Sequence, residues 1–310
     1  MSTAAIEPTN AVPAPTKLSK LARKRLERFA TLFPKVLLRD APDTIHDLRV
    51  ASRRLQQALR LVLPSSKSPG ARKVMRMPRK VRRAFGACRN LDATLALVEK
   101  KLAGAATASL RQSWDTVRLW LEQKRSTELE RARKELKRHD LVDFIVRVQE
   151  HLEGMDPEPA SIGQLGEKAH DAFTAWKDAL ESAKAEPQVK QIHAFRIAGK
   201  RLRYRAESLA ELGDTALKPL VQGLKALQDD LGDWHDRCVL RQHVAEFIGR
   251  PGFLAAEPGM GRALLLEMER DKQRDHTTIN DVILRAEKLA ETGMEENLGE
   301  RSAEAAVKDQ

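Results

Sequence analysis

Aromatic residues, cysteines and long apolar runs are scarce in this sequence. Phe, Trp and Tyr together make up 4% of its 310 residues, and tyrosine occurs once. Glycine and proline are modest in number, at 16 and 14 residues, whereas 32% of the residues are charged. This balance disfavours strands and favours helices. We therefore expect an all-α protein that is long enough to bury its own core.

The two cysteines, Cys88 and Cys238, are too few for a disulfide framework and do not have the spacing of metal ligands. No stretch approaches the roughly eighteen apolar residues that a membrane-spanning helix requires. Residues 1–16 lack the basic start and the apolar run of a secretory signal. These absences predict a soluble cytoplasmic protein with packed thiols, no cofactor and no membrane partner.

Positive charge is concentrated in one part of the chain. Between Lys17 and Asp92 there are 21 Lys and Arg residues but 5 Asp and Glu residues, whereas the remainder has 34 basic and 39 acidic residues. Charge needed only for solubility could be spread anywhere, so a local surplus favours a field directed at an anionic partner. A solvated basic surface would give the same count, and charge alone does not separate the two interpretations.

Apolar residues recur at helical spacing along almost the whole chain. We expect the first helix to stop near Pro34 and the third to bend near Pro78. The expected helices cover residues 18–33, 43–63, 68–102, 107–137, 141–152, 162–184, 189–212, 216–247 and 260–289. The spacing and composition divide the chain into a disordered leader (1–16), a first helical bundle (17–153), a second helical bundle (160–290) and a disordered tail (291–310). The boundary between the bundles falls at Pro157 and Pro159.

A basic segment occurs twice, 147 residues apart. Residues 45–55 read IHDLRVASRRL, and residues 192–202 read IHAFRIAGKRL. A second pair follows in the same order, with FGACRN at residues 85–90 and LGDWHD at residues 231–236. Because order and spacing are both kept, the two halves are predicted to be related helical bundles.

Each copy has two stripes when it is placed on a helix. One stripe is apolar, as in Ile45, Leu48 and Leu55, and should face the core. The other stripe is polar, and we expect it to form a binding surface. In the first copy it comprises His46, Arg49, Arg53, Gln57 and Arg60, and in the second His193, Arg196, Lys200, Tyr204 and Glu207.

The helix expected over residues 68–102 carries a further basic row. Arg72, Arg76, Arg79 and Arg83 share one edge, opposite Val74 and Val81. Like charges at this spacing destabilise an isolated helix, so a row of this length favours a polyanion that offsets the repulsion. In the second copy the corresponding row thins to Lys218, Gln222, Lys225 and Asp229. We therefore expect an asymmetric site that holds the polyanion mainly from the first half.

Arginine suits this task because its planar guanidinium forms bidentate hydrogen bonds to phosphate oxygens and keeps its charge near neutral pH. Histidine at the head of each stripe can donate a hydrogen bond and gain a charge below about pH 6.5. Stripes that line one cleft would neutralise an extended phosphate chain, and the affinity should then fall steeply with salt, as it does for DNA ligands.

The motifs resemble the CHAD domain family, which is named for conserved histidines in an α-helical domain. The second copy carries the fuller signature, HAFRIAGKRLRY at residues 193–204 followed by KP at 218–219, LK at 224–225, LQ at 227–228 and LGD at 231–233. The first copy matches through His46, Arg49, Arg53, Arg54, Gly86, Arg89 and Asp92. Asn90, Gln57 and the pair Trp234-His235 depart from the family pattern. The resemblance covers about residues 18–289.

The resemblance implies two four-helix bundles related by pseudo-twofold symmetry, with the basic stripes facing a central cleft or pore. It also implies binding of inorganic polyphosphate, often at polyphosphate granules. The stripes and the resemblance together give these candidate polyphosphate-binding residues: His46, Arg49, Arg53, Arg54, Arg60, Arg72, Arg76, Arg79, Arg83, Arg89, His193, Arg196, Lys200, Arg201, Arg203, Tyr204, Lys218 and Lys225.

Two other functions remain as alternatives. A nucleic-acid-binding protein would fit the sequence pI of about 9.7, although Tyr204 is the one aromatic residue in the stripes and single-strand binders usually interleave several. A phosphotransferase or hydrolase would need a carboxylate-held metal, whereas the stripes offer cations that would repel one. We therefore expect polyphosphate binding without catalysis, no metal site, and no nucleic-acid partner.

Overall fold

The computed structural model describes residues 17–63, 69–153 and 160–292, and within these ranges the chain forms helices and short turns without a strand. The all-α prediction is confirmed. The helices are α1 (Lys17–Leu38), α2 (Pro42–Val62), α3 (Pro69–Ala84), α4 (Gly86–Ala103), α5 (Ala108–Leu136), α6 (Leu141–Glu153), α7 (Ala160–Ala185), α8 (Val189–Leu212), η1 (Thr215–Leu217), α9 (Lys218–Ile248), α10 (Phe253–Ala256) and α11 (Pro258–Glu291). The expected disordered leader, the boundary at Pro157 and Pro159 and the tail beyond Thr292 lie outside the described residues.

The first helix does not stop near Pro34, as the sequence predicted. Pro34 lies inside α1, which continues to Leu38. A proline within a helix removes one backbone hydrogen bond, but tertiary contacts here maintain the last turn. Val36 is fully buried in the core, and its carbonyl oxygen accepts a hydrogen bond of 3.0 Å from Nε of Arg133 on α5.

The third predicted helix is divided, but not at Pro78. Pro78 lies within α3, and the division comes at Phe85, whose backbone angles of φ −90° and ψ 13° leave the helical region. Phe85 and Val81 are fully buried, so their packing holds the chain in place at the interruption and in the turn before it. The interruption of the predicted helix therefore comes about two turns after Pro78.

Buried apolar side chains form three cores. The first lies among α1, α2, α3, α6 and the C-terminal end of α5, and the second among α7, α8, the start of α9 and the end of α11. The third core contains Leu91, Trp114 and Leu121 from the first half of the chain and Phe247 and Leu264 from the second. Both halves therefore contribute to one hydrophobic core, and their pseudo-twofold relation stays a prediction.

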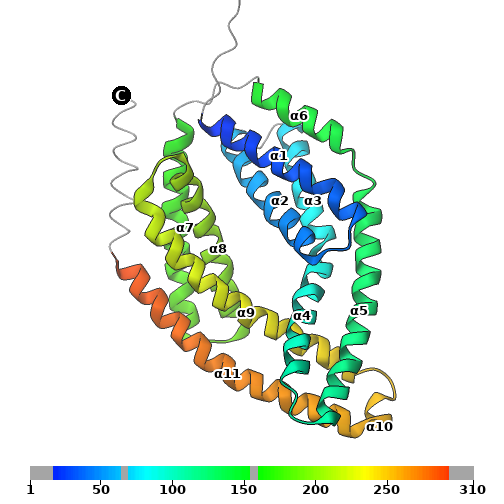
Figure 1. The fold of residues 1–310 in the computed structure, drawn as a ribbon. Helices are drawn as coiled ribbons and strands as arrows, with labels where there is room; N and C mark the ends of the chain where they lie inside the picture. The colour runs from blue at the N-terminus through cyan, green and yellow to red at the C-terminus, as the bar shows by residue number, and fades with distance from the viewer. Residues whose placement is uncertain (1–16, 64–68, 154–159, 293–310) are drawn as a thin grey trace, which may run out of the picture.

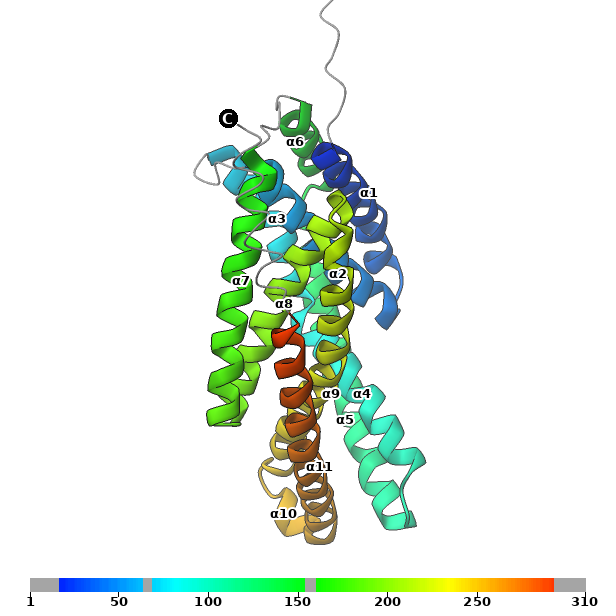
Figure 2. The ribbon, with the colours of Figure 1, turned by 90° about the vertical axis from the view of Figure 1, so that its left-hand side faces the viewer.

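Long helices connect the upper and lower parts of the molecule. In Figure 1, α9 runs diagonally from the group formed with α7 and α8 to the lower ends of α4 and α5, and α11 follows it along the edge. The view in Figure 2 shows α9 and α11 descending below α7 and α8. This arrangement brings α4 against α9, so residues from both repeats lie near each other where these helices cross.

Candidate functional site

The two repeated segments lie on α2 and α8, and their apolar stripes are buried as the sequence predicted. In α2 the buried residues include Ile45, Leu48, Leu55 and Leu59, and in α8 they include Ile192, Phe195, Leu202 and Leu209. The polar stripes consequently point away from the centre of each core. Whether these stripes meet depends on how α2 and α8 are placed relative to each other.

The stripes meet at Arg53 and Tyr204. The guanidinium Nη1 of Arg53 donates a hydrogen bond to the hydroxyl oxygen of Tyr204. The Arg53 guanidinium carbon lies 5.2 Å from the centre of the tyrosine ring, and that of Arg203 lies 4.8 Å from it. Tyr204 is buried between these cations. A first-copy residue therefore contacts the second copy directly.

Cations from both halves gather around this contact. We call Arg49, Arg53, Arg89, Arg196, Lys200 and Arg203 the basic centre. Burial, followed by the positive charges of Arg196, Arg53 and Arg203, lowers the pKa of Lys200 to about 7. Burial together with the charges of Arg53 and Arg89 lowers the pKa of Arg49 to about 10. These shifts show that the cations of α2, α4 and α8 act on one another at short range.

Carboxylates beside the basic centre include Asp236 and Glu207. Burial raises the pKa of Asp236, on α9, while the charges of Arg89 and Arg196 lower it. Arg89 belongs to the first half of the chain and Arg196 to the second, so Asp236 marks the place where the halves adjoin. Glu207 lies 3.6 Å from the guanidinium group of Arg203. These two carboxylates do not balance the six cations of the basic centre.

Histidines occupy one end of the basic centre. Nε of Arg89 donates a 3.1 Å hydrogen bond to Nδ1 of His46, and the rings of His193 and His235 lie 5.4 Å apart. Burial and the neighbouring cations lower the pKa of His46 and of His193, and they lower the pKa of His235 to about 4. These rings are therefore neutral near pH 7, and the charging expected at about pH 6.5 moves to lower pH.

Arg82 belongs to the site, although the sequence analysis did not select it. It donates to the carbonyl oxygen of Ser52 at 3.2 Å and to Oε1 of Gln56, and its own carbonyl accepts a hydrogen bond from Arg49. Burial and the charges of Arg53, Arg49, Arg60 and Arg79 lower its pKa to about 10. Helical periodicity gives no signal for it, because its place in the site depends on the approach of α3 to α2. His235 was noticed only as a departure from the family pattern.

The predicted arginine row on α3 lies largely apart from the basic centre. Its four residues are exposed, on the side away from Val74 and Val81. Arg79 is close enough to lower the pKa of Arg82, whereas Arg76 lines a separate pocket of about 240 Å³ formed with α6. Arg72 and Arg83 are exposed to solvent.

Further predicted residues extend the basic surface or lie outside it. Burial, followed by the charges of Arg201 and Arg60, lowers the pKa of Arg205. Because Arg60 lies on α2 and Arg205 on α8, these two helices also approach each other beyond Tyr204. Arg54 is half-buried on α2. Lys218 and Lys225 are exposed on α9, away from the buried side chains of that helix.

Comparison with known proteins identifies the family. The family model described as CHAD domain matches residues 20–245, which is most of the chain. This chain belongs to the CHAD domain family. The crystal structure of the CHAD domain from the plant Ricinus communis is similar, with a TM-score of 0.63 and 21% sequence identity over 89% of this chain and 94% of that one. At this identity the likeness concerns the fold alone. No curated protein matches the sequence.

Asp92 has a structural role in the CHAD domain. Its Oδ1 accepts a 2.5 Å hydrogen bond from Nε of Arg125 on α5. Arg125 also forms an ion pair with Asp40 at 2.6 Å. Because Asp92 and Arg125 are both largely shielded from water, this ion pair fixes α4 against α5. Arg89, which lies three residues before Asp92, is thereby held beside His46.

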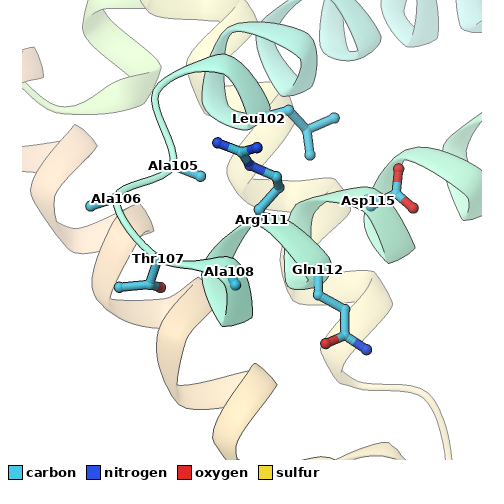
Figure 3. A pocket seen from close by; sticks show the side chains of 8 residues that line it. All are labelled: Leu102, Ala105, Ala106, Thr107, Ala108, Arg111, Gln112 and Asp115. Atoms are coloured by element: carbon cyan, nitrogen blue, oxygen red, sulfur yellow. The ribbon is translucent and has the colours of Figure 1, made fainter.

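The remaining features of the CHAD domain do not add to the basic centre. A pocket of about 640 Å³ lies at the turn between α4 and α5, where Figure 3 shows Arg111 extending toward Leu102 and Asp115 at the far side. Leu102 is about 20 Å along α4 from Arg89. In the described part of the chain no three His, Cys, Asp or Glu side chains are arranged to hold a metal ion. None of the helices described here is long and apolar enough to cross a membrane.

Proposed function

We propose that the protein binds inorganic polyphosphate at the basic centre without chemically altering it. One observation carries the proposal: Arg53 from the first repeat lies close to Arg196 and Lys200 from the second, and burial together with this mutual repulsion lowers the pKa of Lys200 to about 7. Partly buried cations without matching carboxylates destabilise a folded protein. A linear polyanion would offset this repulsion and release its own counterions on binding.

Two further arguments support this ligand. The CHAD family is associated with polyphosphate binding, and the signature residues of both repeats, including His46, Arg53, Arg196 and Lys200, are the ones that lie together. Arginine forks also match phosphate oxygens in geometry. We extend the proposal to a location in the cytoplasm, at polyphosphate granules where these form. A fluorescent fusion that stayed evenly distributed in granule-containing cells would contradict that extension.

Nucleic acid is the competing ligand. Base stacking requires an accessible aromatic face, and Tyr204 is buried with the guanidinium groups of Arg53 and Arg203 over its ring. We expect long-chain polyphosphate to displace labelled DNA from the protein, and DNA not to displace polyphosphate at equal phosphate concentration. Efficient displacement of polyphosphate by duplex or single-stranded DNA would overturn the proposal.

A phosphotransferase or hydrolase is the catalytic alternative. Phosphoryl transfer normally requires carboxylates that hold a metal ion beside the phosphates. The carboxylates Asp236 and Glu207 beside the basic centre do not belong to a group of three potential metal ligands in the described part of the chain. We expect polyphosphate to keep its chain length when it is incubated with the protein and Mg²⁺ or Mn²⁺. Chain shortening at catalytic rates that is abolished by His46→Ala would show that the protein is an enzyme.

A further inference from the structure

A further pocket adjoins the histidine end of the basic centre. It has a volume of about 770 Å³ and lies between the N-terminal end of α8 and the helices α9 and α11. His193 lines this pocket and also lies beside His235, whose pKa is lowered by burial and by the charges of Arg196 and Lys200. The same histidine side chain is therefore shared by the pocket and the basic centre.

The pocket has a positive balance of charge. Lys190, Lys272 and Arg241 line it together with one carboxylate, Asp275. Asp275 is buried and already holds two guanidinium groups, Arg237 at 2.5 Å and Arg241 at 2.6 Å. Because this carboxylate is neutralised, the exposed ammonium groups of Lys190 and Lys272 are left to attract an anion.

The pocket continues the line of cations along α8. From Lys190 the helix presents His193, Arg196 and Lys200 in turn. At 1.5 Å per residue, the distance from Lys190 to Lys200 is about 15 Å. A short anion can contact only part of this line, whereas a long linear anion can follow all of it.

We propose that this pocket is a second anion subsite, which takes the part of a long phosphate polymer that emerges from the basic centre past His193. Long chains occupy the basic centre and the pocket together, and short chains such as tripolyphosphate occupy the basic centre alone. The proposal rests on the function proposed above. It assigns chain-length selectivity to Lys190 and Lys272, which lie outside the basic centre.

The test compares two ligands and two variants of the full-length protein. Lys190→Gln combined with Lys272→Gln removes both pocket ammonium groups, and Lys134→Gln combined with Lys137→Gln removes two exposed charges from the end of α5 as a matched control. Affinities for tripolyphosphate and for long-chain polyphosphate are measured by calorimetry over a range of salt concentrations. We expect the pocket variant to bind long chains on the order of tenfold more weakly, with a salt slope reduced by about two, because each lost contact forfeits about one counterion.

The affinity of the pocket variant for tripolyphosphate should stay within about twofold of the parent protein, which also shows that the variant is folded. An equal loss for both ligands, or a loss no greater than that of the control variant, would overturn the second subsite while leaving polyphosphate binding intact. Failure of the unmodified protein to bind either ligand would refute the proposed function itself, and the second subsite with it.

Discussion

Lys200 lies half-buried among Arg53, Arg196 and Arg203, and these surroundings disfavour its charged form. Its pKa of about 7 lies below the ordinary value of 10.5. At pH 6 the side chain is charged in both the folded and the unfolded state, but only in the folded state is it partly buried and repelled by neighbouring cations. Above pH 10.5 the side chain is neutral in both states, so the penalty disappears. The same charge attracts a polyanion, so stability and binding are opposed at this residue.

Replacing Lys200 by methionine, which is similarly long and unbranched, should therefore stabilise the free protein and weaken polyphosphate binding. We expect a gain of about 1–3 kcal/mol at pH 6, after discounting for solvent screening in a half-buried site. Denaturant unfolding measured at pH 6 and at pH 10 tests the sign. A gain of equal size at both pH values would mean that better packing, rather than removal of a charge, explains it.

Arg49 and Arg53 are neighbours on one stripe but have different roles in the structure. Arg49 donates to the carbonyl oxygen of Arg82 and so ties α2 to α3, whereas Arg53 points toward α8 and its bond to Tyr204 joins the two repeats. We expect Arg49→Ala to lower the free energy of unfolding by about 1–3 kcal/mol, because it leaves a half-buried carbonyl without its donor. Arg53→Ala should change stability by less than about 0.5 kcal/mol, because the lost bond is balanced by relief of repulsion.

The corresponding measurements are chemical denaturation for both variants and polyphosphate titration of the folded proteins. Affinity should fall for Arg53→Ala even where its unfolding curve matches that of the parent protein. If Arg49→Ala proved as stable as Arg53→Ala, the hydrogen bond between α2 and α3 would have no structural importance. Reversal of both arginines to Glu would merge the two effects, so single substitutions are the sharper test.

The sequence predicted most of the basic centre because each stripe follows from helical periodicity alone. His46, Arg49 and Arg53 share one face of α2, and that face can be drawn without a structure. Arg82 could not be found in this way. Its membership of the site depends on the close approach of α3 to α2, where it bonds to Ser52 and Gln56. Periodicity assigns residues to faces, but the distances between faces depend on packing.

At the scale of helices, the contact between α7 and α8 positions the second polar stripe. Gly199 lies on the buried face of α8, and a Cβ atom there would lie 3.3 Å from Nε1 of Trp176 on α7. Trp176 is itself buried and stacked against Phe195, with ring centres 6.0 Å apart. It therefore has little room to move away, and the close approach of the two helices depends on the absence of a side chain at Gly199.

Gly199→Leu should force α7 and α8 apart and lower the free energy of unfolding by about 1–3 kcal/mol. It should also lower polyphosphate affinity, because Arg196 and Lys200 lie on the helix that moves. Ser52→Ala is the matched control, since Ser52 occupies the corresponding buried position of the first repeat and its hydroxyl bonds only to the carbonyl of Leu48 within the same helix. Thermal unfolding that is unchanged in Gly199→Leu would show that the contact adapts.

Helix boundaries followed from the sequence where local signals and packing agree. The expected helix over residues 189–212 has the bounds of α8, whereas the expected stop at Pro34 was wrong. Proline signals a lost hydrogen bond, but α1 gains more from the burial of Val36 than it loses at Pro34. The interruption at Phe85 has no proline, and it falls on a buried aromatic side chain, whose packing periodicity does not reveal.

At the scale of the whole molecule, the internal repeat and the hydrophobic cores divide the chain differently. The repeat separates residues 17–153 from residues 160–290, and two of the three cores respect that division. The third core does not, because α4 and α5 supply one side of it and α9 and α11 supply the other. The basic centre is divided in the same way, with Arg53 and Arg89 from one half and Arg196 and Lys200 from the other.

Neither half should therefore fold stably alone. A fragment of residues 17–153 would expose Leu91, Trp114 and Leu121, which are fully or almost fully buried in the intact chain, and its complement would expose Phe247 and Leu264. Exposed apolar area of this kind favours association or loss of structure. We expect each fragment to aggregate or to lack a cooperative thermal transition when it is expressed alone. Co-expressed fragments should purify together and bind polyphosphate.

The two fragments also separate the contributions of the repeats to binding. If the basic centre requires both halves, polyphosphate affinity should appear only when residues 17–153 and 160–292 are present together, although the first fragment contains most of the surplus positive charge. Calorimetry on the fragments and on their complex would measure this directly. A folded, monomeric first fragment with the affinity of the intact chain would show that its charge alone is sufficient and that Arg196 and Lys200 do not contribute to the site.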